Sequence, residues 1–272
     1  MKNLLLDLVL TITGIGAASG LVYKDEHLYL ISDNSRYLYD FSISEHLLSK
    51  IQLDQNTDQL ENIIKAKKPD FEAITFDRDQ FYIYGSGSTS NRNLRLSYQK
   101  YVQQEDFTPI YQRLQQRFAV DQDNFNIEGV IHTDDEIWLF NRGNAEKAQN
   151  GIFKIDKLDP EQSSFHPISL PHLDHVQTAF TDAILVDDTV YFIAAAEDSK
   201  SNYLDGEVAG TILGKFKRND FSSLETITLP GKHKFEGITL KEKTEKTISF
   251  FLCEDRDDDK TETNIYSLIM DH

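Results

Sequence analysis

The sequence is poor in several residue types, and each shortage narrows what the protein can be. It has one cysteine, Cys253, in 272 residues, so no disulfide can form within the chain, which is typical of a reducing compartment. This cysteine ends the apolar run Ile248–Cys253, and we expect a buried, unreactive thiol there. Methionine and tryptophan are scarce, at 2 and 1, whereas 12 Tyr and 17 Phe favour strands over helices.

Positive charge is also in short supply. The chain has 28 Lys and Arg against 45 Asp and Glu, which gives a formal net charge of −17. Proteins bind nucleic acids and anionic membrane surfaces through clustered basic residues, so we expect neither of these partners. Solubility is the simplest explanation of the acidity, and the composition leaves a protein partner open.

Long hydrophobic runs are missing too, since no stretch approaches the roughly 18 apolar residues of a membrane-spanning helix. Residues Met1–Ser19 contain a lysine, an apolar run and small residues, an order also found in secretory signals. Asp7 interrupts this run, however, and Leu4–Thr13 is rich in residues that favour strands. We therefore expect a cytoplasmic protein. A periplasmic or secreted location is the alternative if residues 1–19 are a signal.

Five copies of one short motif are spread evenly along the chain. Each has a polar residue, then Gly or Ala, then an aliphatic residue. The best-defined copy lies in the segment Asn126–Arg142. The copies start at residues 19, 72, 128, 182 and 236, which places successive copies 53 to 56 residues apart. A repeat of this length is typical of propellers and solenoids, whose units cannot bury their apolar faces alone.

Within each copy, short apolar runs alternate with turn residues, as four antiparallel strands would. The last copy is one strand short, and Leu4–Thr13 can supply its outer strand and close the ring. The sequence therefore predicts one all-β domain over residues 1–272. It is a five-bladed β-propeller of four-stranded antiparallel blades in which the N-terminal strand completes the last blade. The expected blades cover residues 19–55, 71–111, 126–170, 181–229 and 235–270 plus 4–13.

Some segments between the copies are less regular. Helical spacing of apolar residues predicts a short helix over Gln59–Lys67. The fourth strand of the second copy is weakly marked, and we place it at Phe107–Tyr111, before a helical Gln112–Phe118. A six-bladed ring with a degenerate copy in Val102–Asp123 is the alternative. The other expectations are outer strands at His166–Leu170 and Leu224–Leu229 and a long loop over Ala195–Gly210.

The polar residue that opens each copy is expected to lie at the mouth of the central channel, because the first strand of a propeller blade lines that channel. These residues are Ser19, Glu72, Glu128, Asp182 and Glu236. Four carboxylates around one axis would repel one another unless positive charge compensates them. One basic residue follows the second strand of each copy, at the same end of the ring: Arg36, Arg92, Arg142, Lys200 and Arg256.

This ring of acids and bases has two interpretations. Each arginine can pair with a carboxylate of a neighbouring blade, a structural role that suits its planar guanidinium. Alternatively, the acids at 72, 128, 182 and 236 bind Ca²⁺ or Mg²⁺, which prefer hard oxygen ligands, while the arginines bind an anionic ligand. Further oxygen ligands near the same end are Asp33, Asn34, Asn91, Asn141, Glu197, Asp198, Glu254 and Asp255.

The motifs themselves resemble a known group of proteins. The segments ASGLVY with LYLISDNS, FEAITF with FYIYGSGS, IEGVIH with IWLFNRGN, and FEGITL with FFLCEDRD are similar to those of bacterial phytase-like and SdiA-regulated propellers. The resemblance extends over all five copies. It implies a β-propeller with a polar site on the axis and calcium-dependent hydrolysis of a phosphoester or ester.

Two functional hypotheses follow. In the first, an axial pocket binds a small anionic or metal-bridged ligand and hydrolyses it. Glu72, Glu128, Asp182 and Glu236 would hold the metal, with Glu128 and Glu236 as the catalytic residues that orient water. The ligand's negative charge would be bound by Arg36, Arg92, Arg142 and Arg256, together with Asn34 and Asn141. In the second, the protein is a non-catalytic binding or scaffold propeller whose Glu and Arg residues hold the blades together.

Overall fold

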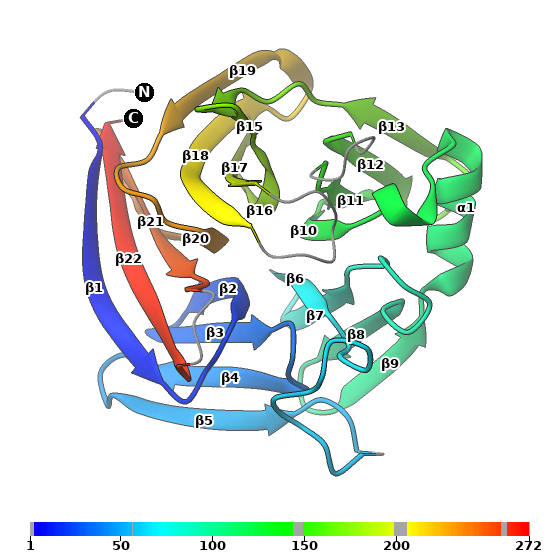
Figure 1. The fold of residues 1–272 in the computed structure, drawn as a ribbon, viewed down its shortest axis with the longest axis horizontal. Coiled ribbons are helices and arrows are strands. Elements are labelled where there is room, and N and C mark those ends of the chain that lie inside the picture. Colours follow the sequence, from blue (N-terminus) through cyan, green and yellow to red (C-terminus); the bar gives the residue numbers. More distant parts are fainter. Residues whose placement is uncertain (1–2, 56, 144–148, 199–205, 257–259, 272) are drawn as a thin grey trace.

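Five four-stranded antiparallel sheets form a closed ring, as the repeats predict (Figure 1). The structure, a computed structural model, describes residues 3–55, 57–143, 149–198, 206–256 and 260–271. The first four blades are β2–β5 (Ala18–Lys24, His27–Ser32, Tyr37–Ser42, Leu47–Gln52), β6–β9 (Phe71–Asp77, Gln80–Gly85, Leu94–Tyr98, Val102–Asp106), β10–β13 (Ile127–His132, Glu136–Asn141, Gly151–Asp156, Ser163–Pro167) and β16–β19 (Ala179–Val186, Thr189–Asp198, Glu207–Lys217, Asp220–Thr228).

The fifth blade joins the two ends of the chain. Its first three strands are β20 (Phe235–Lys243), β21 (Thr247–Glu254) and β22 (Glu262–Asp271), and β1 (Leu5–Thr13) pairs with β22 as the outer strand. Figure 1 shows β1 and β22 side by side, so the prediction that the N-terminal strand completes the last blade is confirmed.

The first strand of each blade lies at the centre of the ring and packs against the first strands of the two neighbouring blades. Small residues make this close approach possible. A Cβ atom added to Gly237 would lie 2.9 Å from the Leu21 backbone nitrogen, and one added to Gly129 would lie 3.1 Å from the Ala183 nitrogen. Between the blades, large aromatic side chains such as Phe140, Phe180 and Phe192 fill the core.

The weakly marked segments show where the sequence-based prediction is wrong. The fourth strand of blade two is β9 (Val102–Asp106), and residues 107–111 instead begin helix α1 (Thr108–Phe118). Pro109 explains the difference, because proline fits the first turn of a helix but donates no hydrogen bond to a sheet. Since 102–123 forms β9, α1 and the short 3₁₀ helix Gln122–Asn124, it contains no sixth blade.

The predicted helix over Gln59–Lys67 is not formed. Asn62 has a positive φ of 51°, and the backbone N–H of Ile63 donates to Asn34 O (3.0 Å), so the segment pairs with a loop of blade one. Two outer strands begin earlier than expected, at Ser163 and Asp220, and Ile168 and Leu170 are buried just beyond the third blade. Within the predicted loop 195–210, residues 195–198 belong to β17 and 207–210 to β18, whereas 199–205 lie outside the described residues.

A second, small hairpin, β14–β15 (His172–Leu173, Val176–Gln177), joins blades three and four. Cys253 is fully buried, as predicted. Among the residues described, no helix is both long and apolar enough to cross a membrane.

Candidate functional site

A β-bulge recurs at the start of the inner strand in all five blades. In each blade one residue is skipped in the pairing between the first and second strands. We call this end of the ring of inner strands the channel mouth. The skipped residues are Ser19, Glu72, Glu128, Thr181 and Glu236. A bulge frees its extra residue from the regular ladder, so the same backbone feature presents a polar side chain five times.

Blade four departs from the predicted alignment by one residue. Thr181, and not Asp182, is skipped there, and the Thr181 hydroxyl donates to Phe235 O (2.6 Å) of the next blade. The Ser19 hydroxyl makes the equivalent bond to Phe71 O (2.5 Å). Both oxygens of Asp182 accept backbone hydrogen bonds, Oδ1 from Ala183 N–H (2.7 Å) and Oδ2 from Ile238 N–H (2.8 Å). Asp182 therefore joins two inner strands and is not equivalent to the three glutamates.

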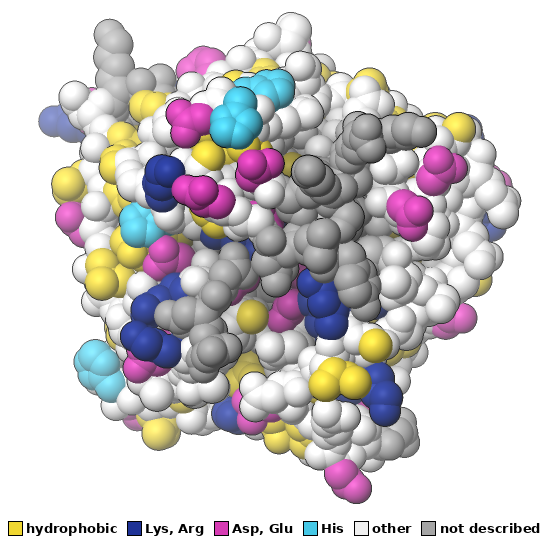
Figure 2. All heavy atoms as spheres, in the orientation of Figure 1, with side chains coloured by type: hydrophobic (Ala, Val, Ile, Leu, Met, Phe, Trp, Pro, Cys, Tyr) yellow, Lys and Arg dark blue, Asp and Glu magenta, His cyan; other side chains and the backbone are white. Residues whose placement is uncertain are grey.

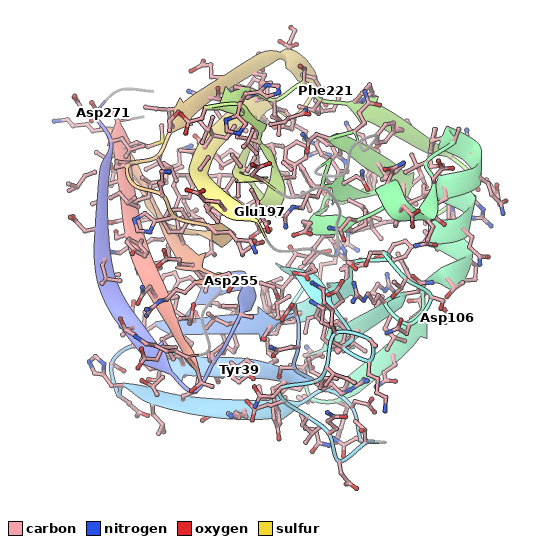
Figure 3. The ribbon with its side chains drawn as sticks, in the orientation of Figure 1. Tyr39, Asp106, Glu197, Phe221, Asp255 and Asp271 are labelled. Atoms are coloured by element: carbon pink, nitrogen blue, oxygen red, sulfur yellow. The ribbon has the colours of Figure 1, made fainter. Side chains whose placement is uncertain are left out.

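Arg142 contacts carboxylates from three blades. Its Nη1 lies 3.3 Å from Glu128 Oε2 and 3.8 Å from Glu236 Oε1, and its Nη2 lies 2.7 Å from Glu197 Oε2. All four side chains are buried. Figure 3 labels Glu197, which points from β17 toward the middle of the ring. The structure thus brings together Glu128, Glu236 and Arg142, as the sequence predicted, and adds an acid from the β17 extension.

Lys234 supplies a second buried positive charge beside this group. Its Nζ lies 3.3 Å from Glu236 Oε1, 3.3 Å from Asp255 Oδ2 and 3.8 Å from Glu197 Oε2. Asp255 is also labelled in Figure 3, near the centre of the ring. Acidic and basic side chains gather around the middle of the face shown in Figure 2.

The other side of the channel mouth holds an acidic group formed by Asp33, Asp70 and Glu72. Each offers a carboxylate oxygen, and these oxygens lie within 4.8 Å of one another. Asp70 accepts ion pairs from Lys68 Nζ (2.6 Å) and Arg92 Nη1 (2.8 Å), and Lys68 also contacts Asp33. Arg92 thus pairs with Asp70, two residues before the glutamate of its blade.

The remaining predicted ligand-binding residues lie in other contacts. Arg36 pairs with Asp54 (2.8 Å), and Arg256 lies 3.8 Å from Glu262. The side chain of Asn141 bonds to the backbone, accepting from Asn126 N–H (2.9 Å) and donating to two carbonyls. Asn34 accepts a hydrogen bond from the Ser32 hydroxyl (3.1 Å). Lys200 lies outside the described residues.

Three members of the site, Lys68, Asp70 and Lys234, were not identified from the sequence, although a signal for two of them exists. Asp70 and Lys234 occupy the same position of the repeat, two residues before Glu72 and Glu236 and directly before β6 and β20 begin. Lys68 lies four residues before Glu72 and carries no such signal.

Burial changes the protonation of these carboxyl groups. It raises the pKa of Glu72 well above the usual range, and the neighbouring charges of Asp70 and Glu128 raise it further. Burial also raises the pKa of Glu128, against the opposing charge of Arg142. For Glu236, burial raises the pKa to about 8 even though Lys234 and Arg142 oppose the shift. Asp70 differs: Lys68 and Arg92 outweigh its burial and lower its pKa.

These shifts predict a pH-dependent stability. A glutamate whose pKa is higher in the folded than in the unfolded protein binds its proton more tightly when folded. The free energy of unfolding should therefore fall as the pH rises from about 4.5 to about 8, by up to about 1.4 kcal/mol per pH unit for Glu236. Urea unfolding at several pH values across this range would measure the free energy of unfolding. Glu236→Gln should flatten the slope, whereas Glu105→Gln, at a half-exposed surface pair with Arg95, should leave it unchanged.

Together, the five blades and the charged channel mouth define a β-propeller with a polar axial site. The chain belongs to a family of unknown function, DUF6929, whose model matches residues 14–270. No curated protein matches the chain.

Several solved structures share its fold at low sequence identity. A putative glycoside hydrolase from Parabacteroides distasonis is 10% identical with a TM-score of 0.55, covering 94% of this chain and 86% of that one. A PQQ-bound aldose sugar dehydrogenase from Streptomyces coelicolor is 11% identical with a TM-score of 0.54, covering 98% and 99%. Myxococcus xanthus glutaminyl cyclase is 9% identical with a TM-score of 0.51, covering 98% and 97%. These similarities support the propeller fold.

Proposed function

We propose that the protein binds a divalent cation, Ca²⁺ or Mg²⁺, at its channel mouth and, through it, a small anionic ligand. The group formed by Asp33, Asp70 and Glu72 carries this proposal, because its oxygens lie within 4.8 Å of one another. Glu72 has no hydrogen bond or ion pair among the described residues, and Asp33 Oδ1 accepts no hydrogen bond there. Hard oxygen ligands in this arrangement suit either cation.

The charge balance at the channel mouth also favours a cation. The buried bases are Lys68, Arg92, Arg142 and Lys234, and the acids are Asp33, Asp70, Glu72, Glu128, Glu197, Glu236 and Asp255. Among the described residues, acids therefore outnumber bases at the channel mouth, and burial raises the pKa of Glu72 and Glu128. A bound cation would stabilise the ionised forms and compensate the excess negative charge.

Hydrolysis of a phosphoester or ester is the reaction that we propose for this site, in line with the resemblance to phytase-like propellers. The cation would polarise the ester or phosphoester oxygen. Glu236, with a pKa of about 8, can exchange a proton near neutral pH and would serve as the general base. Glu128 would orient the attacking water, and Arg142, which contacts both glutamates, would bind the ligand's negative charge.

Cation binding gives a direct test. Millimolar Ca²⁺ or Mg²⁺ should raise the Tm of the wild type, because a ligand that binds only the folded state stabilises it. Glu72→Gln should remove this increase, since Glu72 is the axial acid without a partner among the described residues. Differential scanning fluorimetry with and without EDTA measures the effect. Glu105→Gln should respond as the wild type does. An equal increase in both variants would contradict the cation site.

A scaffold without a ligand is the second candidate, and the contacts of Arg142 favour it. This residue pairs with acids of blades three, four and five, so the same charges also hold the ring together. If neither cation changes the Tm of the wild type while removal of Arg142 lowers it strongly, the scaffold function would account for the site.

A further inference from the structure

Glu197 enters the site from a part of the chain that the repeats do not share. Its strand, β17, has 10 residues, whereas the equivalent strands β3, β7 and β11 have 6 each and β21 has 8. The pairing of β17 with β18 shifts between Ala196 and Glu197, where the hairpin continues beyond the blade. Blade four, whose inner strand presents Thr181, therefore contributes its carboxylate from this extension.

Glu197 occupies the position that an anionic ligand would take between two buried bases. Its Oε2 lies 2.7 Å from Arg142 Nη2 and 3.8 Å from Lys234 Nζ. Of the ion pairs that Arg142 makes with described residues this is the shortest, since its contacts with the repeated acids are 3.3 and 3.8 Å long. The other oxygen, Oε1, accepts a hydrogen bond from Gly206 N–H (2.9 Å), so the same side chain also stabilises the hairpin β17–β18.

Two polar atoms beside Glu197 have unused hydrogen-bonding capacity. Arg142, whose side chain is 7% exposed, has a buried Nε without a hydrogen-bond partner within the described part of the chain. The buried Glu236 Oε1 accepts no hydrogen bond there either, although Lys234 and Arg142 lie near it. Buried donors and acceptors are rarely left without partners, so a ligand that contacts Arg142 through two nitrogens would complete this group.

We propose that Arg142 and Lys234 form a subsite for the carboxylate of a small ligand, and that Glu197 fills this subsite until the ligand displaces it. The planar guanidinium matches a carboxylate through two parallel hydrogen bonds, and Nε together with Nη2 supplies the required pair of donors. This inference rests on the proposed axial ligand site but not on the cation. It specifies the ligand as a carboxylic acid that competes with an internal carboxylate.

The test compares malonate, as a small carboxylate probe, with inorganic phosphate by isothermal titration calorimetry at constant ionic strength in EDTA. Glu197→Ala opens the position, and Glu197→Gln keeps its shape but removes the charge. Both variants should bind malonate about tenfold more tightly than the wild type, because the competing charge is gone. Glu207→Gln is the matched control, since Glu207 lies on the same hairpin in an exposed pair with Lys232. It should bind malonate as the wild type does.

Hydrogen exchange of Gly206 gives a second readout that a purely structural ion pair would not change. Malonate should accelerate exchange of this amide in the wild type, because Glu197 must release it to admit the ligand. If Glu197→Ala does not fold, Glu197→Gln and the exchange measurement still distinguish a displaceable carboxylate from a purely structural ion pair. Equal malonate affinity in Glu197→Gln and the wild type would overturn the proposal, as would tighter binding of phosphate than of malonate. Because EDTA excludes divalent cations, these results are independent of the cation test.

Discussion

Replacing Arg142 with methionine should lower the free energy of unfolding by about 3–5 kcal/mol near pH 7.5, the cost of breaking a buried ion pair from one side. The variant would leave Glu128 and Glu197 without their guanidinium partner, and Glu236 would keep an ion pair with Lys234 alone among the described residues. Urea unfolding followed by tryptophan fluorescence can measure this, since Trp138 is buried in blade three. The loss should shrink toward pH 5, where protonation of the glutamates removes the uncompensated charge.

Arg113→Met is the matched control for this prediction. Arg113 pairs with Glu161 (2.9 Å) on the surface, with both side chains about one-third or more exposed, so its loss should cost less than about 1 kcal/mol. The double variant Arg142→Met with Glu197→Gln should recover part of the stability, because it removes one unpaired carboxylate. If Arg142→Met cost no more than Arg113→Met, the charges at the channel mouth would be solvated and would not join the blades.

The ring could be predicted from sequence because its repeat is long, regular and reinforced by composition. Small residues such as Gly129 and Gly237 recur where inner strands approach closely, so their spacing records the geometry directly. Outer strands carry a weaker signal. β9, with the sequence VQQED, is mostly exposed, and without an alternating apolar face it resembles a loop.

The site was harder to predict because side-chain contacts depend on single residues rather than on the repeat. In blade four, the sequence offers a threonine and an aspartate side by side, and only the position of the bulge decides which one faces the channel. Lys68 and Lys234 reach the acids from segments that precede the inner strands, outside the motif. Arg36 follows the motif, yet it pairs with Asp54 within its own blade.

Asp182 should be the acid whose loss costs most, because it joins the inner strands of blades four and five. Asp182→Ala would leave the N–H groups of Ala183 and Ile238 without their acceptor in a fully buried place. Each such group costs about 1–3 kcal/mol, so the free energy of unfolding should fall by about 2–6 kcal/mol. Asp182→Asn should cost about half as much, because its one carbonyl oxygen can still accept from one N–H.

Urea unfolding of the two Asp182 variants should be compared with that of Asp187→Ala. The comparison separates the joining of the inner strands by Asp182 from the general effect of removing a negative charge. Asp187 also links blades four and five, through Lys243, but its side chain is 71% exposed, so its loss should cost less than about 1 kcal/mol. Both Asp182 variants should keep the increase in Tm with Ca²⁺, because the aspartate's oxygens are already bonded to the backbone. If Asp182→Asn abolished that increase without lowering stability, Asp182 would be a cation ligand. The one-residue shift of the bulge in blade four, from Asp182 to Thr181, would then have no functional consequence.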